Sequence, residues 1–391
     1  MNTTQMDPRI RPFRIAVPEA VVDDLRRRLA SARLPEPLPE DSWDDGIPSS
    51  VLRELVRGWT AHDWRATEQR LNGLPQIVTE IDGQTVHAVY VRSAHPGATP
   101  LLLLHGWPGS FLEFEDLIGP LTDPTSHGGD AADAFDVIIP SHPGFGFSTP
   151  LSSGPWPVER VASLHLELMS RLGYDRFTVQ GGDYGAAVAP AIGRMAPERV
   201  IGVHANGSLG TFAGEVDEET AASLTPLERD RLRRIAEFMQ REFGYISIQS
   251  TRPGLIGAMT ADSPLGQIAW IYDKLQAWTH PAEADALRIL GERFVFDNAS
   301  LYWLTGCAGS AASVVYAQPP QWGVRKEKSG VPSAVIAFAH DVGLRVVEEQ
   351  ENDVVRWTDV EGRGGHFAAL EEPELLVADV REFFRALDGP R

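Results

Sequence analysis

Residues 179–187, Val-Gln-Gly-Gly-Asp-Tyr-Gly-Ala-Ala, end an apolar run in a glycine-rich turn and lead into an alanine-rich segment. Asp183 stands in this turn, with Gly181 two residues before it and Gly185 two residues after it. A strand, a Gly-x-Asp-x-Gly turn and a helix match the nucleophile elbow, in which glycines permit a strained turn that lifts one side chain above the edge of a sheet. Serine usually holds that position, but no serine of this chain has glycine at both required places.

Apolar runs alternate with helical patterns on both sides of this turn. The runs lie at residues 99–106, 135–140, 176–181, 200–205, 333–341 and 354–362. Several of them are too uniformly apolar for one face to be wet, as expected of a parallel sheet covered by helices on both faces. They predict an α/β fold with a mostly parallel, doubly wound sheet. Ahead of them, two alternating runs around Asp82-Gly83 predict a β-hairpin.

Two helical regions interrupt this alternation, and they set the predicted domain boundaries. Residues 1–75 form a predicted N-terminal helical region packing on the core, because apolar residues recur at helical spacing between charges. Residues 76–209 are the first part of the α/β core. Residues 210–320, which contain helical patterns and no strand run, are predicted to form an inserted helical cap. Residues 321–391 complete the core.

An aspartate at the elbow indicates a particular reaction class. A carboxylate is ionised at neutral pH and attacks a saturated carbon without a base, which yields an ester that water can still cleave. A serine attacking the same carbon would give an ether, which water cannot cleave in the same way. The alternative is that Asp183 only caps the following helix, since aspartate favours helix N-termini.

The expected partners follow along the chain in the order acid, then histidine. Asp341 ends one predicted strand, and His366 follows Gly364 and Gly365 in a loop after the next. His366 would remove a proton from water. Asp341 would fix the tautomer of His366 and stabilise its imidazolium form. A surface histidine, a capping aspartate and the neighbouring His340 are the alternatives.

Two backbone amides are expected to form an oxyanion hole. The loop "HGWPGS", residues 105–110, follows the first strong strand and would supply the amide of Trp107; the residue after the nucleophile would supply that of Tyr184. The loop alone is equally readable as a simple turn.

Composition limits the partners. The chain has 391 residues, with 54 acidic and 35 basic side chains and a net charge of −19, which opposes nucleic acid and anionic lipid. Residues 1–12 lack the apolar core of a signal peptide, and no apolar run is long enough to span a membrane, so we expect a cytoplasmic protein. The single cysteine, Cys307, gives no disulfide and no metal-ligand spacing.

A strained ring oxygen that leaves as an alkoxide needs a hydrogen-bond donor, and a neutral phenol suits this role. The predicted cap offers Tyr245, Tyr272, Tyr302 and Tyr316. The residues alone do not choose between these tyrosines, and for any single one a packed aromatic is the more common interpretation.

The chain resembles the microsomal-type epoxide hydrolases from about residue 10 onward. The resemblance rests on the runs "HGWPGS", "SHPGFGFS", "GGDYG", "GYISIQSTRP", "SVVYAQ" and "GGHFAALEEPELL", with "HDWRATEQRLN" and "IDGQTVHAVYV" nearer the N-terminus. It implies an α/β-hydrolase that converts an epoxide and water to a vicinal diol without cofactor or metal. By motif, it makes Asp183 the nucleophile, His366 and Asp341 the water-activating pair, and Tyr245 and Tyr316 the tyrosines that hold the oxirane oxygen.

Two rival functions remain. A haloalkane dehalogenase shares the elbow aspartate but commonly needs the indole N–H of a tryptophan after the nucleophile, where this chain has Tyr184. A ligand-binding relative without turnover is the other alternative. Tryptophans of the predicted cap, Trp270, Trp278 and Trp303, suggest a bulky apolar or aryl epoxide from secondary metabolism, such as antibiotic biosynthesis, or from detoxification. A homodimer is possible.

Overall fold

A nine-stranded sheet runs through the part of the chain that the computed structural model describes, residues 7–210, 216–316, 318 and 326–387. Its strands in space follow the order β1-β2-β3-β5-β4-β6-β7-β8-β9. Their bounds are β1 (Arg11–Pro12), β2 (Gln76–Ile81), β3 (Gln84–Val91), β4 (Thr99–Leu104), β5 (Phe135–Pro140), β6 (Phe177–Gly181), β7 (Val200–Asn206), β8 (Pro332–Ala337) and β9 (Asp353–Asp359).

The strand predictions are confirmed, including the hairpin. Strands β5, β4, β6, β7, β8 and β9 pair in parallel, whereas β1, β2 and β3 form an antiparallel edge that joins β5. Asp82 and Gly83 between β2 and β3 both have positive φ, 53° and 72°, as a two-residue hairpin turn requires. The sheet is therefore mostly parallel, as the apolar runs predict.

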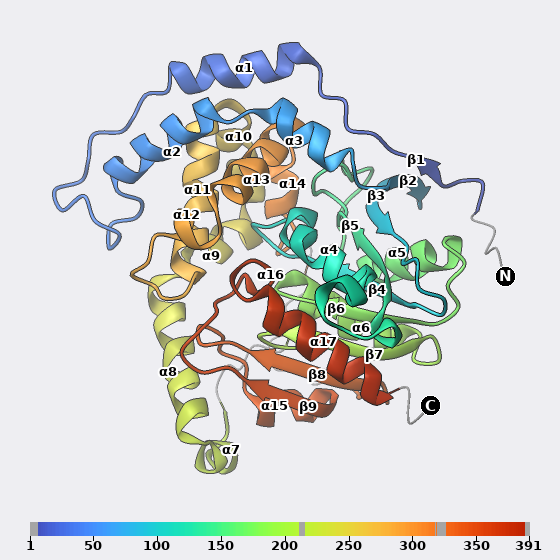
Figure 1. Ribbon diagram of the computed structural model, residues 1–391. Helices are drawn as coiled ribbons and strands as arrows, with labels where there is room; N and C mark the ends of the chain where they lie inside the picture. Colours follow the sequence, from blue (N-terminus) through green and yellow to red (C-terminus); the bar gives the residue numbers. More distant parts are fainter. Residues whose placement is uncertain (1–6, 211–215, 317, 319–325, 388–391) are drawn as a thin grey trace.

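Helices cover both faces of the sheet. Leu101 and Leu103 of β4 pack into one hydrophobic core with helices α4 (Glu115–Thr122) and α17 (Pro373–Leu387), while Leu102 and Leu104 pack into a second core with α5 (Val158–Arg171) and α6 (Tyr184–Met195). This alternation explains why the strand is apolar throughout. In Figure 1, α17 lies on the near side of β7 and β8.

Eight helices lie between β7 and β8 among the described residues: α7 (Glu218–Ser223), α8 (Pro226–Arg241), α9 (Gly244–Thr251), α10 (Pro253–Asp262), α11 (Pro264–Trp278), α12 (Ala286–Ile289), α13 (Glu292–Thr305) and α14 (Ala308–Ala312). They occupy the region predicted as a cap. Residues 211–215, 317 and 319–320 of that region lie outside the described residues, as do the chain ends 1–6 and 388–391.

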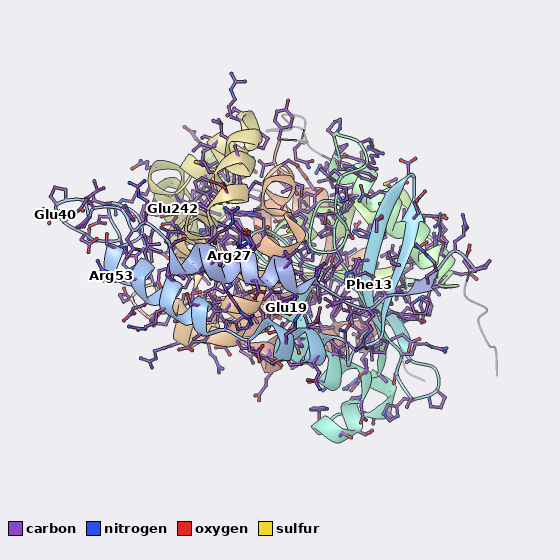
Figure 2. All side chains as sticks on the ribbon, turned by 90° about the horizontal axis from the view of Figure 1, so that it is seen from above. Phe13, Glu19, Arg27, Glu40, Arg53 and Glu242 are labelled. Atoms are coloured by element: carbon purple, nitrogen blue, oxygen red, sulfur yellow. The ribbon has the colours of Figure 1, made fainter. Side chains whose placement is uncertain are left out.

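The N-terminal helices contact the cap region and also belong to the hydrophobic core that contains strand β4 and helix α4. Helices α1 (Glu19–Ala30), α2 (Ser49–Ala61) and α3 (Trp64–Leu71) lie against α11 and α13 (Figure 1). The Trp59 indole donates a buried 2.8 Å hydrogen bond to the Ser300 hydroxyl of α13. Only the chain around β1 joins the sheet, and Figure 2 shows Phe13 beside the strands and Glu40 at the opposite end of α1.

The remaining helices are short. They are the 3₁₀ helices η1 (Phe111–Phe114), η2 (Pro124–His127) and η3 (Ala131–Asp133), with α15 (Arg345–Glu351) and α16 (Ala368–Glu371). Pro190 lies inside α6, and the helix continues past it to Met195. Within the described residues, no helix combines the length and the apolar character needed to cross a membrane.

Candidate active site

Asp183 occupies a strained turn between β6 and α6. Its φ of 53° and ψ of −121° lie where side chains rarely place the backbone. A Cβ on Gly185 would overlap with the carbonyl oxygen of Leu104, and a Cβ on Gly181 would overlap with the carbonyl of Gly185. The two glycines are therefore required by close backbone contact. Asp183 stands at the N-cap position of α6 without a side-chain capping hydrogen bond, which counts against the capping alternative.

We expect Gly185→Ala to destabilise the protein by about 1–3 kcal/mol, because the added methyl group has to displace the backbone of β4. Gly193→Ala in the same helix is the control, since its Cβ would make only ordinary contacts with valine side chains. Urea unfolding of both variants measures the difference. Equal stability of the two would contradict the close approach at Gly185.

The two carboxylate oxygens of Asp183 have different partners. Oδ1 accepts a 2.9 Å hydrogen bond from the amide of Trp107, and the amide of Tyr184 also donates to the carboxylate. Oδ2 lies 3.4 Å from Nε2 of His366. Burial opposes ionisation, but the hydrogen bonds from His366 and the two amides outweigh it and lower the pKa of Asp183 below its usual value. The carboxylate is thus held ionised with one oxygen in an amide pocket.

His366 lies in the loop between β9 and α16. Gly364 of this loop has a φ of 74°, and the amide of His366 donates a 3.0 Å hydrogen bond to the carbonyl of Trp278 at the end of α11. Burial opposes the imidazolium form, but the hydrogen bond and charge of Asp183, with the charge of Asp341, raise the pKa of His366. The histidine is therefore fixed at its backbone and close to the nucleophile.

Asp341 lies behind His366 in the turn after β8. Its Oδ2 accepts a 2.8 Å hydrogen bond from the amide of Phe338, and burial raises the pKa of Asp341 to about 6. Within the described residues, Asp341 and His366 interact through their charges without a direct hydrogen bond. His340, the rival of His366, has its pKa lowered to about 3 by burial, and its carbonyl accepts from Arg234.

Of the four cap tyrosines, Tyr245 lies against Trp107, whose amide binds Asp183. Its ring stacks on Trp107 with a centroid distance of 5.2 Å, and burial and the charge of Asp183 raise the pKa of its phenol well above the usual value. The hydroxyl of Tyr272 donates to Asp285 and that of Tyr302 to the carbonyl of Gly109. Tyr316 is 56% exposed and precedes residues outside the described part of the chain, so its assignment stays a prediction.

A cavity of about 10 Å³ lies at the carboxyl ends of β4, β6 and β7. Its polar lining comes from Asp183, His366, Glu113, Asn206 and His105. We did not predict Glu113 or Asn206. Asn206 ends a strand at the catalytic edge, and that position is a usable sequence signal, whereas Glu113 lies in a short 3₁₀ helix without a recognisable pattern.

Aromatic side chains form a wall beside the cavity. The Trp278 ring lies 5.3 Å from Tyr245, 6.1 Å from Trp107 and 4.9 Å from His366 between centroids. Trp303, in contrast, faces the N-terminal region, where the Arg28 guanidinium lies 5.6 Å from its ring. Of the three tryptophans considered from the sequence, Trp278 thus lies beside His366 and Trp107.

Comparison with known proteins identifies the family. Residues 10–114 match the model of the epoxide hydrolase N terminus, and residues 99–252 match the alpha/beta hydrolase fold. A putative epoxide hydrolase of Stigmatella aurantiaca is 42% identical over 97% of this chain and 85% of its own length. Epoxide hydrolase 1 of Sus scrofa is 33% identical over 98% of this chain and 90% of its own length.

The chain belongs to the epoxide hydrolase family. Solved structures agree, since the juvenile hormone epoxide hydrolase of Bombyx mori matches with a TM-score of 0.87 and 28% identity over 99% of this chain and 97% of that one. The Aspergillus niger epoxide hydrolase matches with a TM-score of 0.84 and 28% identity, over 98% and 99%. These matches confirm the α/β-hydrolase fold and an enzyme of the epoxide hydrolase family, and they favour it over a dehalogenase.

Proposed function

We propose that this family member converts a bulky apolar or aryl epoxide to a vicinal diol through an ester on Asp183, with neither cofactor nor metal. The observation that carries the proposal is the division of the Asp183 carboxylate, with Oδ1 on the Trp107 amide and Oδ2 towards His366. An aspartate without a chemical role would not need a strained backbone, a lowered pKa and two oxygens with different partners.

In the first step, Oδ2 of Asp183 attacks one ring carbon of the epoxide, and the bond from that carbon to the ring oxygen breaks. The released oxygen takes a proton from the Tyr245 phenol, which is held neutral by its raised pKa. Tyr316 is the second tyrosine proposed for this oxygen. The product of the step is a hydroxyalkyl ester of Asp183.

In the second step, His366 removes a proton from a water molecule, and the resulting hydroxide attacks Cγ of the ester. Negative charge then develops on Oδ1, where the amides of Trp107 and Tyr184 stabilise it. Cleavage of the bond between Cγ and Oδ2 releases the diol, whose departing oxygen takes the proton of the newly added hydroxyl, and restores the carboxylate. The proton on His366 then passes to the Tyr245 phenolate, which returns both residues to their starting states. The charge of Asp341 stabilises the imidazolium that forms on His366.

The aromatic wall supports the proposed substrate class. Trp107, Tyr245 and Trp278 are neighbours within 5.2–6.1 Å of one another and border the nucleophile and histidine. Flat aromatic faces favour an apolar or aryl substituent on the epoxide. Formation of diol from styrene-type epoxides, in preference to short aliphatic ones, is the expected result of a substrate panel.

A single turnover in heavy-oxygen water tests the ester. With enzyme in excess over epoxide, the first diol should carry ordinary oxygen taken from Asp183, and the heavy isotope should enter the carboxylate of residue 183. Mass spectrometry of the peptide containing residues 179–187 and of the diol measures both. Heavy oxygen in the first diol, without any in Asp183, would mean direct attack by water and would refute the proposal.

Tyr245→Phe should lower the rate of ester formation by roughly 10- to 100-fold, because the leaving oxygen loses a hydrogen bond donated in the transition state. Its matched comparison is Tyr316→Phe. Stopped-flow quenching of Trp107 and Trp278 fluorescence by the bound epoxide measures the step. An unchanged rate in the Tyr245 variant would remove that residue from the mechanism, and an unchanged rate in the Tyr316 variant would remove the second tyrosine.

A further inference from the structure

Glu113 places a third carboxyl group at the active-site cavity, besides those of Asp183 and Asp341. It lies in η1, directly after the loop that supplies the Trp107 amide, and lines the same cavity as Asp183 and His366. A Cβ on Gly109 would overlap with Oε1 of Glu113. The absence of a side chain at Gly109 therefore makes room for the carboxyl group.

The surroundings of Glu113 tie it to the reacting groups. Burial and, less strongly, the negative charge of Asp183 raise the pKa of Glu113 to about 8, while the charge of His366 and a hydrogen bond from the backbone of Ser110 oppose this shift. Asp183 loses its charge when it becomes an ester, so one cause of the raised pKa disappears during the reaction. The state of Glu113 is thus coupled to the reaction cycle.

The cavity has the size and chemistry for one water molecule. Its volume of about 10 Å³ is near the lower limit that a single water needs, and a buried water requires two to four polar partners. Glu113, His366, Asp183 and Asn206 offer polar atoms around it. Asn206 is itself oriented, since its amide oxygen accepts a 2.9 Å hydrogen bond from Gln180.

We propose that Glu113 holds the water molecule that cleaves the Asp183 ester. One hydrogen of this water goes to Nε2 of His366, and the other is directed to a carboxyl oxygen of Glu113, so that a lone pair of the water oxygen faces Cγ of Asp183. A carboxyl group keeps an acceptor oxygen in both protonation states, so this hydrogen bond survives the change of charge at Asp183. The inference rests on the ester mechanism proposed above.

The role predicts an effect on the second step alone. In Glu113→Leu, which keeps the approximate volume without an acceptor, ester hydrolysis should slow roughly 10- to 100-fold, the value of one hydrogen bond to a charged transition state. Ester formation should stay unchanged. The ester then accumulates, and KM falls in proportion to kcat, so that kcat/KM is preserved. Glu113→Gln, which retains an acceptor oxygen, should recover most of the lost rate.

Rapid-quench mass spectrometry of the intact protein measures both steps, and Asp116→Leu at the exposed start of α4 is the control. Ester hydrolysis at the normal rate in Glu113→Leu would overturn the inference, as would an equal loss in both steps with a lower melting temperature, which a structural role predicts. A glutamine variant as slow as the leucine variant would also overturn it. The His366→Gln variant separates the two proposals. If it forms no ester, the ester mechanism itself is refuted. If it does form the ester, while Glu113→Leu hydrolyses its ester at the normal rate, only the role of Glu113 is refuted.

Discussion

Asp183→Asn is expected to lower kcat by roughly 10⁴-fold or more, because an amide is neutral and cannot supply the attacking oxygen. The substitution keeps the shape of the side chain and an oxygen for the Trp107 amide, which holds Oδ1 at 2.9 Å in the native protein. The loss should therefore come from the chemistry and not from collapse of the turn. Steady-state formation of diol measures it.

Two further measurements isolate the cause in this variant. The melting temperature should stay near that of the native protein or fall slightly, because the neutral amide loses the interaction with His366 that lowers the pKa of Asp183. Exposure to epoxide should add no mass to the protein. Steady turnover at more than a hundredth of the native rate would show that Asp183 is not the nucleophile.

His366→Gln should separate the two steps. Ester formation needs only the ionised Asp183 and a proton donor, so we expect one rapid alkylation per enzyme molecule. Ester hydrolysis loses its base, and steady turnover should fall by roughly 10²- to 10⁴-fold. Intact-protein mass spectrometry should show the protein heavier by the full mass of the epoxide, since the ring opens without a leaving fragment.

The position of the adduct decides whether the assignment is right. Peptide mapping should locate the added mass on Asp183 and should leave Glu113 and Asp341 unmodified. His340→Gln is the matched control, because His340 is a half-buried histidine near His366 and its carbonyl, not its ring, accepts from Arg234. That variant should turn over at close to the native rate. An arrested ester in His340→Gln, with normal turnover in His366→Gln, would exchange the roles of the two histidines.

The inner part of the sheet was predictable because its strands are buried on both faces. A central strand such as β4, with four consecutive leucines shared between two cores, has no polar position to obscure its pattern. The elbow was predictable for a related reason. The backbone contacts at Gly181 and Gly185 exclude any side chain. The positions of these two glycines in the sequence therefore identify the turn.

The cavity residues were harder to predict because they depend on three-dimensional contacts. Nothing in the sequence distinguishes Tyr245 from Tyr272 or Tyr302, whose hydroxyls are used by Asp285 and by the Gly109 carbonyl. Glu113 is a single glutamate in a short 3₁₀ helix, and only the approach of Gly109 shows that its carboxyl group is accommodated at the cavity. The motif resemblance selects Tyr245 and gives no information on Glu113.

Helix α13 is held from two directions. On one side the Trp59 indole of α2 binds Ser300, and on the other the Tyr302 hydroxyl binds the Gly109 carbonyl in the loop that leads from Trp107 to Glu113. A movement of α13 away from the sheet breaks the Tyr302 hydrogen bond, and it also breaks the Trp59 hydrogen bond unless α2 moves with α13. The N-terminal segment thus acts as a brace for α13. Substitutions in this segment are expected to lower the activity by weakening the support of the loop that binds the nucleophile.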